Sequence, residues 1–225
     1  MIKKNRKTKE VAAVPARKGA DLRRPVAELR EVGPAPFLGD ELVEEARAVG
    51  LDLSERELPG LSVKISVLEG VSFAGTEISA PFLQDVRLVR CDLSNATWRS
   101  FQATRVEFVE CRLIGMKALE CNWQDVLLQD CDGRYLQLTD GRLRSCEFRE
   151  SNFTEADLRA VDLGSTVLGH LDLSRADLRG ARLRNVDLRD SEIEGMLVAA
   201  EDVRGAIVSP SQAMELARLL GLVIR

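Results

Sequence analysis

The stretch from Ser151 to Asp190 reads SNFTE ADLRA VDLGS TVLGH LDLSR ADLRG ARLRN VDLRD. Within it, a large apolar residue recurs at every fifth position, from Phe153 to Leu188. A small or medium residue lies two positions before each, often with Asp or Asn between them. Helices repeat about every 3.6 residues and strands about every 2, so a period of five indicates short extended runs that alternate with corners. The stretch is therefore an internal repeat.

The same register extends well beyond this stretch. Every fifth position from Leu53 to Val208 is apolar except Gly133, and only Ala103 and Ala118 among the others are small. No insertion or deletion interrupts the series. With 225 residues, of which 45% are hydrophobic, the chain is long enough to bury one continuous core.

The repeat resembles that of the pentapeptide-repeat family. The pattern Ala-Asp-Leu occurs at 156–158 and 176–178, with the variants Cys-Asp-Leu at 91–93 and Ser-Asn-Phe at 151–153. The resemblance implies an all-β fold, a right-handed quadrilateral parallel β-helix with four pentapeptides per coil. Residues 51–208 would form a solenoid of about eight coils. The central Leu or Phe of each repeat, and the small residue two positions before it, would point inward.

A coil of twenty residues can be tested against the sequence itself, because residues twenty apart should stack on the same wall. Each inward residue that is unusually large then faces one that is unusually small, as close packing requires. The predicted pairs are Trp98 with Ala118, Trp123 with Ala103, and Phe153 with Gly133.

Three of the five cysteines, Cys91, Cys111 and Cys131, also lie twenty apart, in the small inward position. Side chains stacked in this way point in parallel, whereas metal ligands converge on one point. We interpret them as small buried residues and expect no metal site. No signal peptide or membrane-spanning run is recognisable, which favours a cytoplasmic protein with reduced thiols.

The N-terminal residues differ from the repeat. Residues 1–24 hold nine Lys or Arg against two acidic residues, which predicts a disordered basic tail. Such a tail could contact nucleic acid or an acidic protein surface, or could simply increase solubility. Residues 25–50 are predicted to form an N-terminal helical cap that protects the open edge of the solenoid, with helices over Pro25–Val32 and Asp40–Val49.

Residues 209–225 are predicted to form a C-terminal helix and a short tail. Ser209 and Gln212 match a capping box, and Pro210 suits the first helical position, so we expect a helix from Pro210 to Leu220. Its apolar stripe could cover the last coil or form a dimer interface, and the family resemblance favours a homodimer. The candidate cap or dimer residues are Ala213, Leu216, Ala217 and Leu220.

Nothing in the sequence indicates catalysis. The only histidine, His170, occupies an outward position, and neither a Ser–His or Cys–His arrangement nor a Gly-rich phosphate loop is present. We therefore expect a protein that is not an enzyme and needs no cofactor.

The register sorts the outward charges onto four walls, named after their first central residues Leu53, Leu58, Val63 and Leu68. The first and fourth walls have net charges of −5 and −4 and form an acidic corner, the second wall has −2, and the third has +3. The candidate partner-binding surfaces are a basic set on the third wall (Arg142, Arg144, Arg182 and Arg184) and an acidic set on the fourth (Glu107, Glu110, Glu147 and Glu150).

The family resemblance suggests a function through members that protect type II topoisomerases and are thought to imitate duplex DNA. It implies a non-catalytic protein-binding scaffold, a partial DNA mimic with DNA gyrase or topoisomerase IV as its candidate partner. Duplex DNA carries about one charge per 1.7 Å, far more than the two acidic walls supply, and hence the mimicry would be partial. The alternative is a purely structural, self-associating rod.

Overall fold

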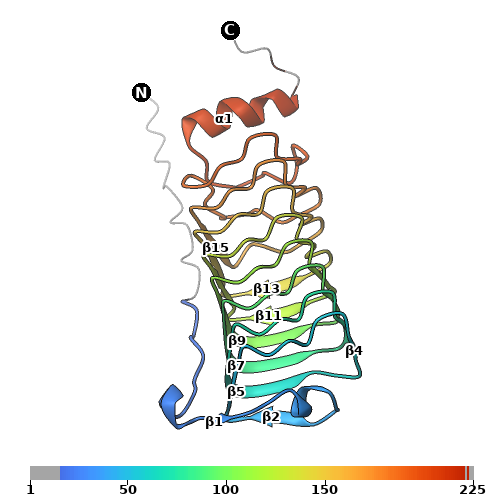
Figure 1. The fold of residues 1–225 in the computed structure, drawn as a ribbon. Coiled ribbons are helices and arrows are strands. Elements are labelled where there is room, and N and C mark those ends of the chain that lie inside the picture. Colours follow the sequence, from blue (N-terminus) through green and yellow to red (C-terminus); the bar gives the residue numbers. More distant parts are fainter. Residues whose placement is uncertain (1–15, 221, 223–225) are drawn as a thin grey trace.

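The computed structural model describes residues 16–220 and Leu222. They form a parallel β-solenoid that is closed at one end by a short helix (Figure 1). A ladder of bridges joins Asp52, Ser72, Asp92 and their successors to Glu192 in steps of twenty residues, which gives about seven turns. The four-walled coil is confirmed, and the turn count is close to the expected eight.

The third and fourth walls form one continuous sheet. β5 (Ser62–Glu69), β7 (Phe82–Val89) and β9 (Gln102–Val109) bend across the corner between them and contribute to both walls. The third wall adds β2 (Leu42–Glu44), β11 (Asn122–Gln124) and β13 (Arg142–Arg144). The fourth wall adds β3 (Ala46–Val49), β12 (Leu127–Gln129), β14 (Cys146–Arg149) and β15 (Thr166–Gly169).

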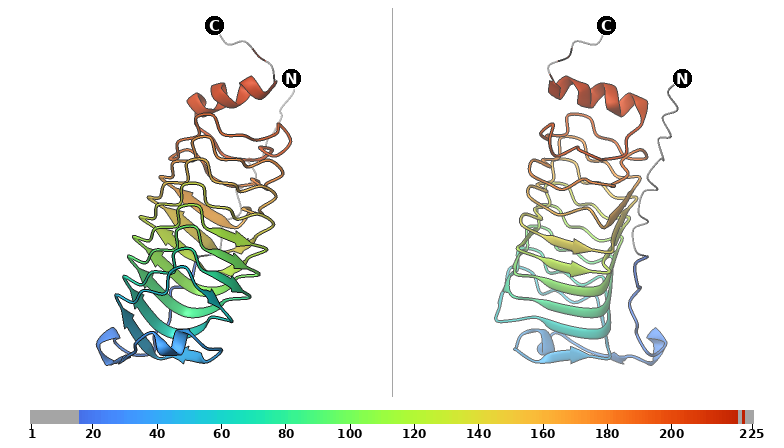
Figure 2. Two further views of the ribbon diagram at one scale, coloured as in Figure 1. Left: turned by 45° about the vertical axis from the view of Figure 1, so that its right-hand side comes forward. Right: turned by 180° about the vertical axis from the view of Figure 1, so that it is seen from behind.

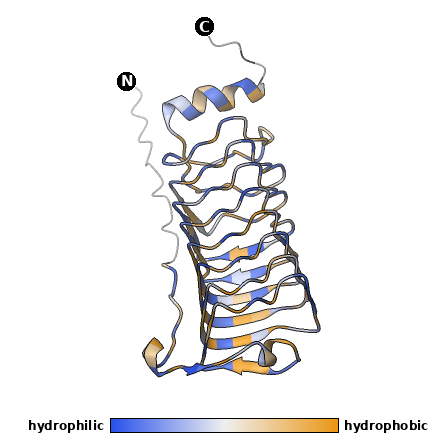
Figure 3. Cartoon of the chain, in the orientation of Figure 1, coloured by the Kyte–Doolittle hydropathy of each residue, from blue (hydrophilic) through white to orange (hydrophobic). Residues whose placement is uncertain are grey.

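The second wall is a smaller parallel sheet, and the first wall consists only of isolated bridges. The second wall contains β4 (Glu57–Leu58), β6 (Glu77–Ser79), β8 (Thr97–Arg99) and β10 (Lys117–Leu119). Hydrophobic and hydrophilic residues alternate along the strands (Figure 3), because the side chains of a strand point alternately inward and outward.

The corners explain why the period is five. The residue two positions after the central apolar one has a positive φ at most corners, between 47° and 87° over the described chain. Only a minority of these positions are glycine, although an L-residue in this region is strained. The parallel hydrogen bonds on both sides of each corner hold the backbone in this conformation.

The predicted large–small pairs are confirmed. Trp98 pairs with Ala118, Trp123 pairs with Ala103, and both indoles are buried. A Cβ placed on Gly133 would overlap the ring of Phe153, which shows that the ring fills the space that glycine leaves open. The core is continuous along the solenoid, from Val32 to Val198.

The expected helix over Asp40–Val49 is wrong, because β2 and β3 occupy this segment and form the first rung of the solenoid. Leu42 and Val49, which completed the apolar face of the predicted helix, are exposed, whereas Val43 and Ala48 continue the five-residue register inward. Glu45 has a φ of 47°, so a corner falls where the helix would have continued. Edge hydrogen bonds from β5 therefore outweigh a weak helical pattern.

Residues 25–41 do cap this end, although not as α-helices. The expected helix over Pro25–Val32 is replaced by the 3-10 turn η1 (Val26–Glu28) and strand β1 (Arg30–Glu31), which pairs with β3. A second 3-10 turn, η2 (Ala35–Phe37), brings the buried ring of Phe37 into the core cluster.

Helix α1 (Pro210–Ala217) lies across the other end, and the turn η3 (Arg218–Leu220) extends it (Figure 2). The predicted capping box is present: the backbone N–H of Gln212 donates to the Ser209 hydroxyl, and the backbone N–H of Ser209 donates to the Gln212 side chain. The Gln212 side chain also donates hydrogen bonds of 2.6 and 2.8 Å to the carbonyl oxygens of Leu188 and Ser191. It therefore caps the last coil as well as its own helix.

Candidate functional site

The four arginines of the third wall form a basic patch (Arg142, Arg144, Arg182 and Arg184). The β13 residue Arg142 pairs with Asp162, which pairs in turn with Arg182, so these residues stack on successive rungs. All four arginines are exposed. Three of them, Arg142, Arg144 and Arg182, line an open hollow together with Gly141, Ser165 and Gly180.

The positive charge of the basic patch is largely uncompensated. Arg182 forms an exposed ion pair of 3.3 Å with Asp162. The other three guanidinium groups have neither a hydrogen bond nor an ion pair with any residue that the structure describes. Their donors are free to bind carboxylates of a partner.

Four other arginines of the solenoid are neutralised by the Asp two positions before them. Arg159 donates two hydrogen bonds, of 2.8 and 2.7 Å, to the carboxylate of Asp157, and Arg179 does the same to Asp177. The Arg159 guanidinium holds the pKa of Asp157 below its ordinary value of 3.8. Arg134 and Arg189 repeat this arrangement with Asp132 and Asp187.

The acidic set on the fourth wall is only partly exposed, unlike the basic patch. Glu107 is only 6% exposed and accepts hydrogen bonds from Arg87 at 2.9 Å and Arg17 at 3.3 Å. Its burial acts to raise its pKa, but Arg87, the backbone N–H of Ala20 and Arg17 together outweigh this and hold the pKa below the ordinary range. Glu147 is partly covered, with Arg149 at 3.3 Å and Arg17 at 3.8 Å. Glu110 and Glu150 are exposed.

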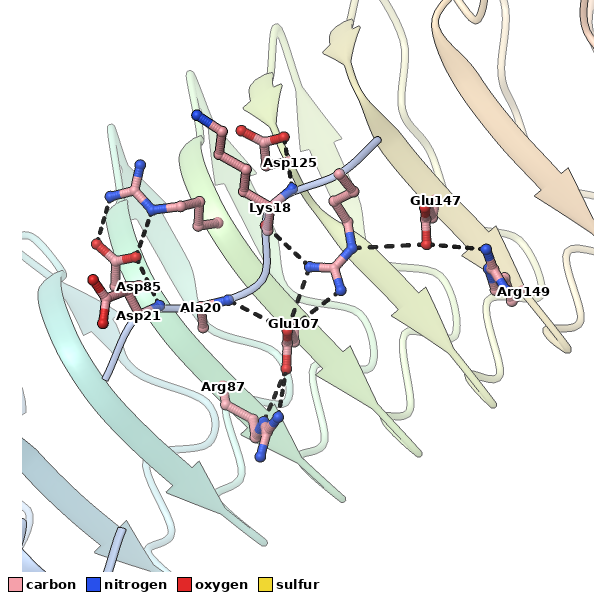
Figure 4. A network of polar contacts seen from close by, with 11 residues as sticks. Lys18, Ala20, Asp21, Asp85, Arg87, Glu107, Asp125, Glu147 and Arg149 are labelled. Atoms are coloured by element: carbon pink, nitrogen blue, oxygen red, sulfur yellow. Dashed lines mark hydrogen bonds and ion pairs between the residues drawn. The ribbon is translucent and has the colours of Figure 1, made fainter. Parts of the chain in front are cut away.

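The segment that covers Glu107 is part of the basic tail, for which the sequence predicted disorder. Residues 1–15 of that tail lie outside the described residues. Residues 16–24 run along the edge between the third and fourth walls, as Figure 1 shows for the whole molecule and Figure 4 from close by. The arm, as we name residues 16–21, contacts four carboxylates: Asp85, Glu107, Asp125 and Glu147.

Asp85, its ion-pair partner Arg105, and Asp125 were not predicted from the sequence as members of a site. Arg105 donates two hydrogen bonds of 2.6 Å to Asp85, which is 3% exposed. The signal was present, because these three residues lie twenty apart on the corner between the third and fourth walls. The net charge of the third wall hid this signal, because the positive charge of Arg105 cancels the negative charge of one of the two carboxylates.

The cysteines occupy the interior, as expected. All five are free and buried, and burial raises the pKa of Cys121 and of Cys146 to about 12. Within the described chain, no group of three or more His, Cys, Asp and Glu side chains could hold a metal ion. His170 is exposed at a corner. No helix among the described residues is long and apolar enough to cross a membrane.

The candidate cap or dimer residues are placed in part. Leu216 packs against the core cluster and Ala217 is half-buried, whereas Ala213 is exposed. The side chain of Leu220 is outside the described part. An apolar cleft of about 270 Å³ runs between α1 and the last coil, and Leu216 and Val203 both line it.

Two family models match adjoining stretches of the chain, which together cover residues 82–190. The model described as "Pentapeptide repeat region" matches residues 82–152, and the one described as "Pentapeptide repeats (8 copies)" matches residues 151–190. No curated protein matches the chain.

Solved structures of the same kind are distant in sequence. Full-length QnrB1, a plasmid-mediated fluoroquinolone resistance protein, is 18% identical, with 86% of this chain and 95% of that chain covered and a TM-score of 0.29. HetL, a pentapeptide repeat protein involved in heterocyst differentiation regulation from the cyanobacterium Nostoc, is 19% identical, with 84% and 92% covered and a TM-score of 0.27.

The repeat models and the observed five-residue register thus agree over the middle of the solenoid. The chain belongs to the pentapeptide-repeat family.

Proposed function

We propose that the protein is a non-catalytic scaffold that binds a protein partner through the charged walls of its solenoid. The observation that carries the proposal is the basic patch, whose exposed guanidinium groups are mostly unpaired among the described residues. Arginines such as Arg159 and Arg179 are neutralised by their own repeat and provide an internal comparison. Unpaired guanidinium groups at regular spacing on one wall can form charge-assisted hydrogen bonds with carboxylates of a partner.

A type II topoisomerase, DNA gyrase or topoisomerase IV, is the partner we propose to test first. The reason for this choice is the family resemblance, which includes members that protect these enzymes, and QnrB1 is itself described as a fluoroquinolone resistance protein. The acidic walls would then act as a partial mimic of DNA. Glu110 and Glu150 are the exposed members of the acidic set and would contribute to this contact.

The test is binding of the full chain to each purified topoisomerase, together with the effect on supercoiling or decatenation and on drug sensitivity. One variant replaces Arg142, Arg144, Arg182 and Arg184 with Gln, and a matched control replaces Arg134, Arg159, Arg179 and Arg189 with Gln. Docking through the basic patch predicts a loss of affinity of at least about tenfold in the first variant, because several charge-assisted contacts are lost. Equal affinities of the two variants would refute it.

The competing proposal is a structural rod that associates only with itself. Exposed apolar side chains at the C-terminal end favour this association: Met214, Leu219 and Leu222 are between 41% and 55% exposed. Through these residues and the adjoining cleft, two copies would form a homodimer. Sedimentation of the full chain and of a Leu219→Glu variant tests the dimer. A full chain that stays monomeric at tens of micromolar excludes it.

A further inference from the structure

The four carboxylates beneath the arm form a slot that is built around one cation. We call Asp85, Glu107, Asp125 and Glu147 the acidic slot. Three arginines of the solenoid pair with it: Arg105 with Asp85, Arg87 with Glu107 and Arg149 with Glu147. Four negative charges therefore meet three positive ones, and Arg17 of the arm supplies the fourth.

The slot also binds the main chain of the arm. The backbone N–H of Lys18 donates to Asp125 at 3.0 Å, that of Ala20 to Glu107 at 3.3 Å, and that of Asp21 to Asp85 at 3.0 Å. Figure 4 shows the arm laid across the strands with these carboxylates beneath it. Hydrogen bonds to backbone amides require an extended segment but place few demands on its side chains.

Two positions of the arm carry the side-chain specificity. Arg17 reaches between Glu107 and Glu147 and is largely buried there. A Cβ on Gly19 would lie 3.1 Å from Oε1 of Glu107, closer than ordinary van der Waals contact, so this position favours glycine. An extended segment with Arg, one intervening residue and Gly therefore fits the slot.

The arm is held weakly enough to be replaced. Most of residues 16–24 are exposed, and no hydrophobic residue of this segment is buried. Nε of Arg17 is buried without a hydrogen bond, 3.8 Å from Glu147. Segments with few buried apolar contacts open at low free-energy cost.

We propose that the acidic slot is a docking site for an extended segment of a protein partner that carries an Arg-x-Gly sequence, and that the arm is the resident segment which the partner displaces. This rests on the proposed scaffold function and gives the chemistry of the partner on its acidic side. The arm keeps the slot neutral until such a segment competes for it. Without Arg17, Glu107 and Glu147 would lie beside an unfilled cation position.

A labelled peptide with the sequence of residues 16–24, ARKGADLRR, tests the proposal on the full chain by fluorescence anisotropy. The Arg17→Ala variant loosens the resident arm and should bind the peptide more tightly than the unchanged protein. The gain is roughly tenfold if the arm fills the slot about nine-tenths of the time. Arg23→Ala is the matched control, because it removes the same charge from a side chain that contacts none of the slot carboxylates.

Two further measurements separate docking from general charge attraction. Adding Glu147→Gln to the Arg17→Ala protein should weaken peptide binding, and the same peptide with Ala in place of its first Arg should bind less well. Equal binding to the unchanged, Arg17→Ala and Arg23→Ala proteins would overturn the proposal. So would equal binding of the two peptides, or an oligomer that dissociates in Arg17→Ala, which would indicate exchange of arms between copies.

The peptide assay needs no client protein, and its outcome is independent of the topoisomerase experiment. If the peptide binds as expected but neither topoisomerase binds the full chain, the proposed topoisomerase function alone is refuted. If a topoisomerase binds but the peptide does not bind as expected, the proposal for the acidic slot alone is refuted.

Discussion

Replacing Gly133 with Ala should destabilise the solenoid, because the ring of Phe153 occupies the space that the new methyl group would need. The added Cβ would overlap two carbons of the ring and would also lie 3.3 Å from the carbonyl oxygen of Asn152. Phe153 cannot easily move away, since it is buried and packs edge-on against Phe148 with ring centroids 5.6 Å apart. The clash must therefore be relieved by moving neighbouring rungs.

The expected size follows from two opposing effects. Overpacking a filled core costs about 1–3 kcal/mol. Gly133 lies outside the left-handed φ region, so Ala would be conformationally tolerated and would restrict the unfolded chain, a gain of about 0.4–1 kcal/mol. The net loss should be roughly 1–2 kcal/mol. Adding Phe153→Leu should recover part of this loss, because the smaller side chain gives the methyl group room.

The assay is urea denaturation of the four proteins of this double-mutant cycle, followed both by tryptophan fluorescence and by circular dichroism. Coincident transitions justify a two-state free energy of unfolding. Gly169→Ala is the control, because its Cβ would meet only Arg149 Cγ at 3.9 Å and should be neutral or slightly stabilising. If Gly133→Ala is as stable as the unchanged protein, or if the two substitutions are additive, the Phe153 overlap does not determine the stability.

Three further outcomes are expected. Ala160 has a φ of 58°, so Ala160→Gly should raise the free energy of unfolding by about 1 kcal/mol, and a lower melting temperature would contradict this. Arg159 lowers the pKa of Asp157, so the pair stabilises the fold above the ordinary pKa of 3.8 and the contribution is lost as the pH falls through the lowered value. Asp157→Asn should then cost a few tenths of a kcal/mol near neutral pH, and the difference should shrink between about pH 5 and about pH 2 in denaturation curves. Burial raises the pKa of Cys121 and of Cys146, so neither thiol should react with iodoacetamide in the native protein at about pH 8, and mass spectrometry should detect alkylation only after denaturation.

The interior of the solenoid could be predicted from the sequence because a single rule governs it. Each fifth residue is central, and residues twenty apart touch, so pairs such as Trp98 with Ala118 follow from counting alone. Helix α1 was also predictable, because the capping box of Ser209 and Gln212 is a local pattern. What counting could not supply was the second role of Gln212 at the carbonyl groups of the last coil.

The N-terminal region was harder to predict because tertiary contacts decide it. The helical spacing of Leu42, Val43, Ala46 and Val49 is real, but pairing with β5 determines the structure. The arm has the composition of a disordered tail, and its position depends on Asp85 and Glu107, which are far away in the sequence. The exposure of the basic patch followed from its outward positions in the repeat, whereas the unpaired state of its guanidinium groups required the side-chain geometry.

The coil of four repeats implies that inside and outside of this protein follow different periods. An inward position is set by its place within five residues, whereas the wall that an outward residue faces is set by its place within twenty. Inserting one extra repeat in the middle would leave every Leu inward, yet would turn all later outward residues by a quarter of a coil. Arg182 would then no longer lie above Arg142. Evolution can therefore lengthen the rod by whole coils without disturbing its charged faces, whereas adding a single repeat would keep the central residues inward but rearrange the charges on the surface.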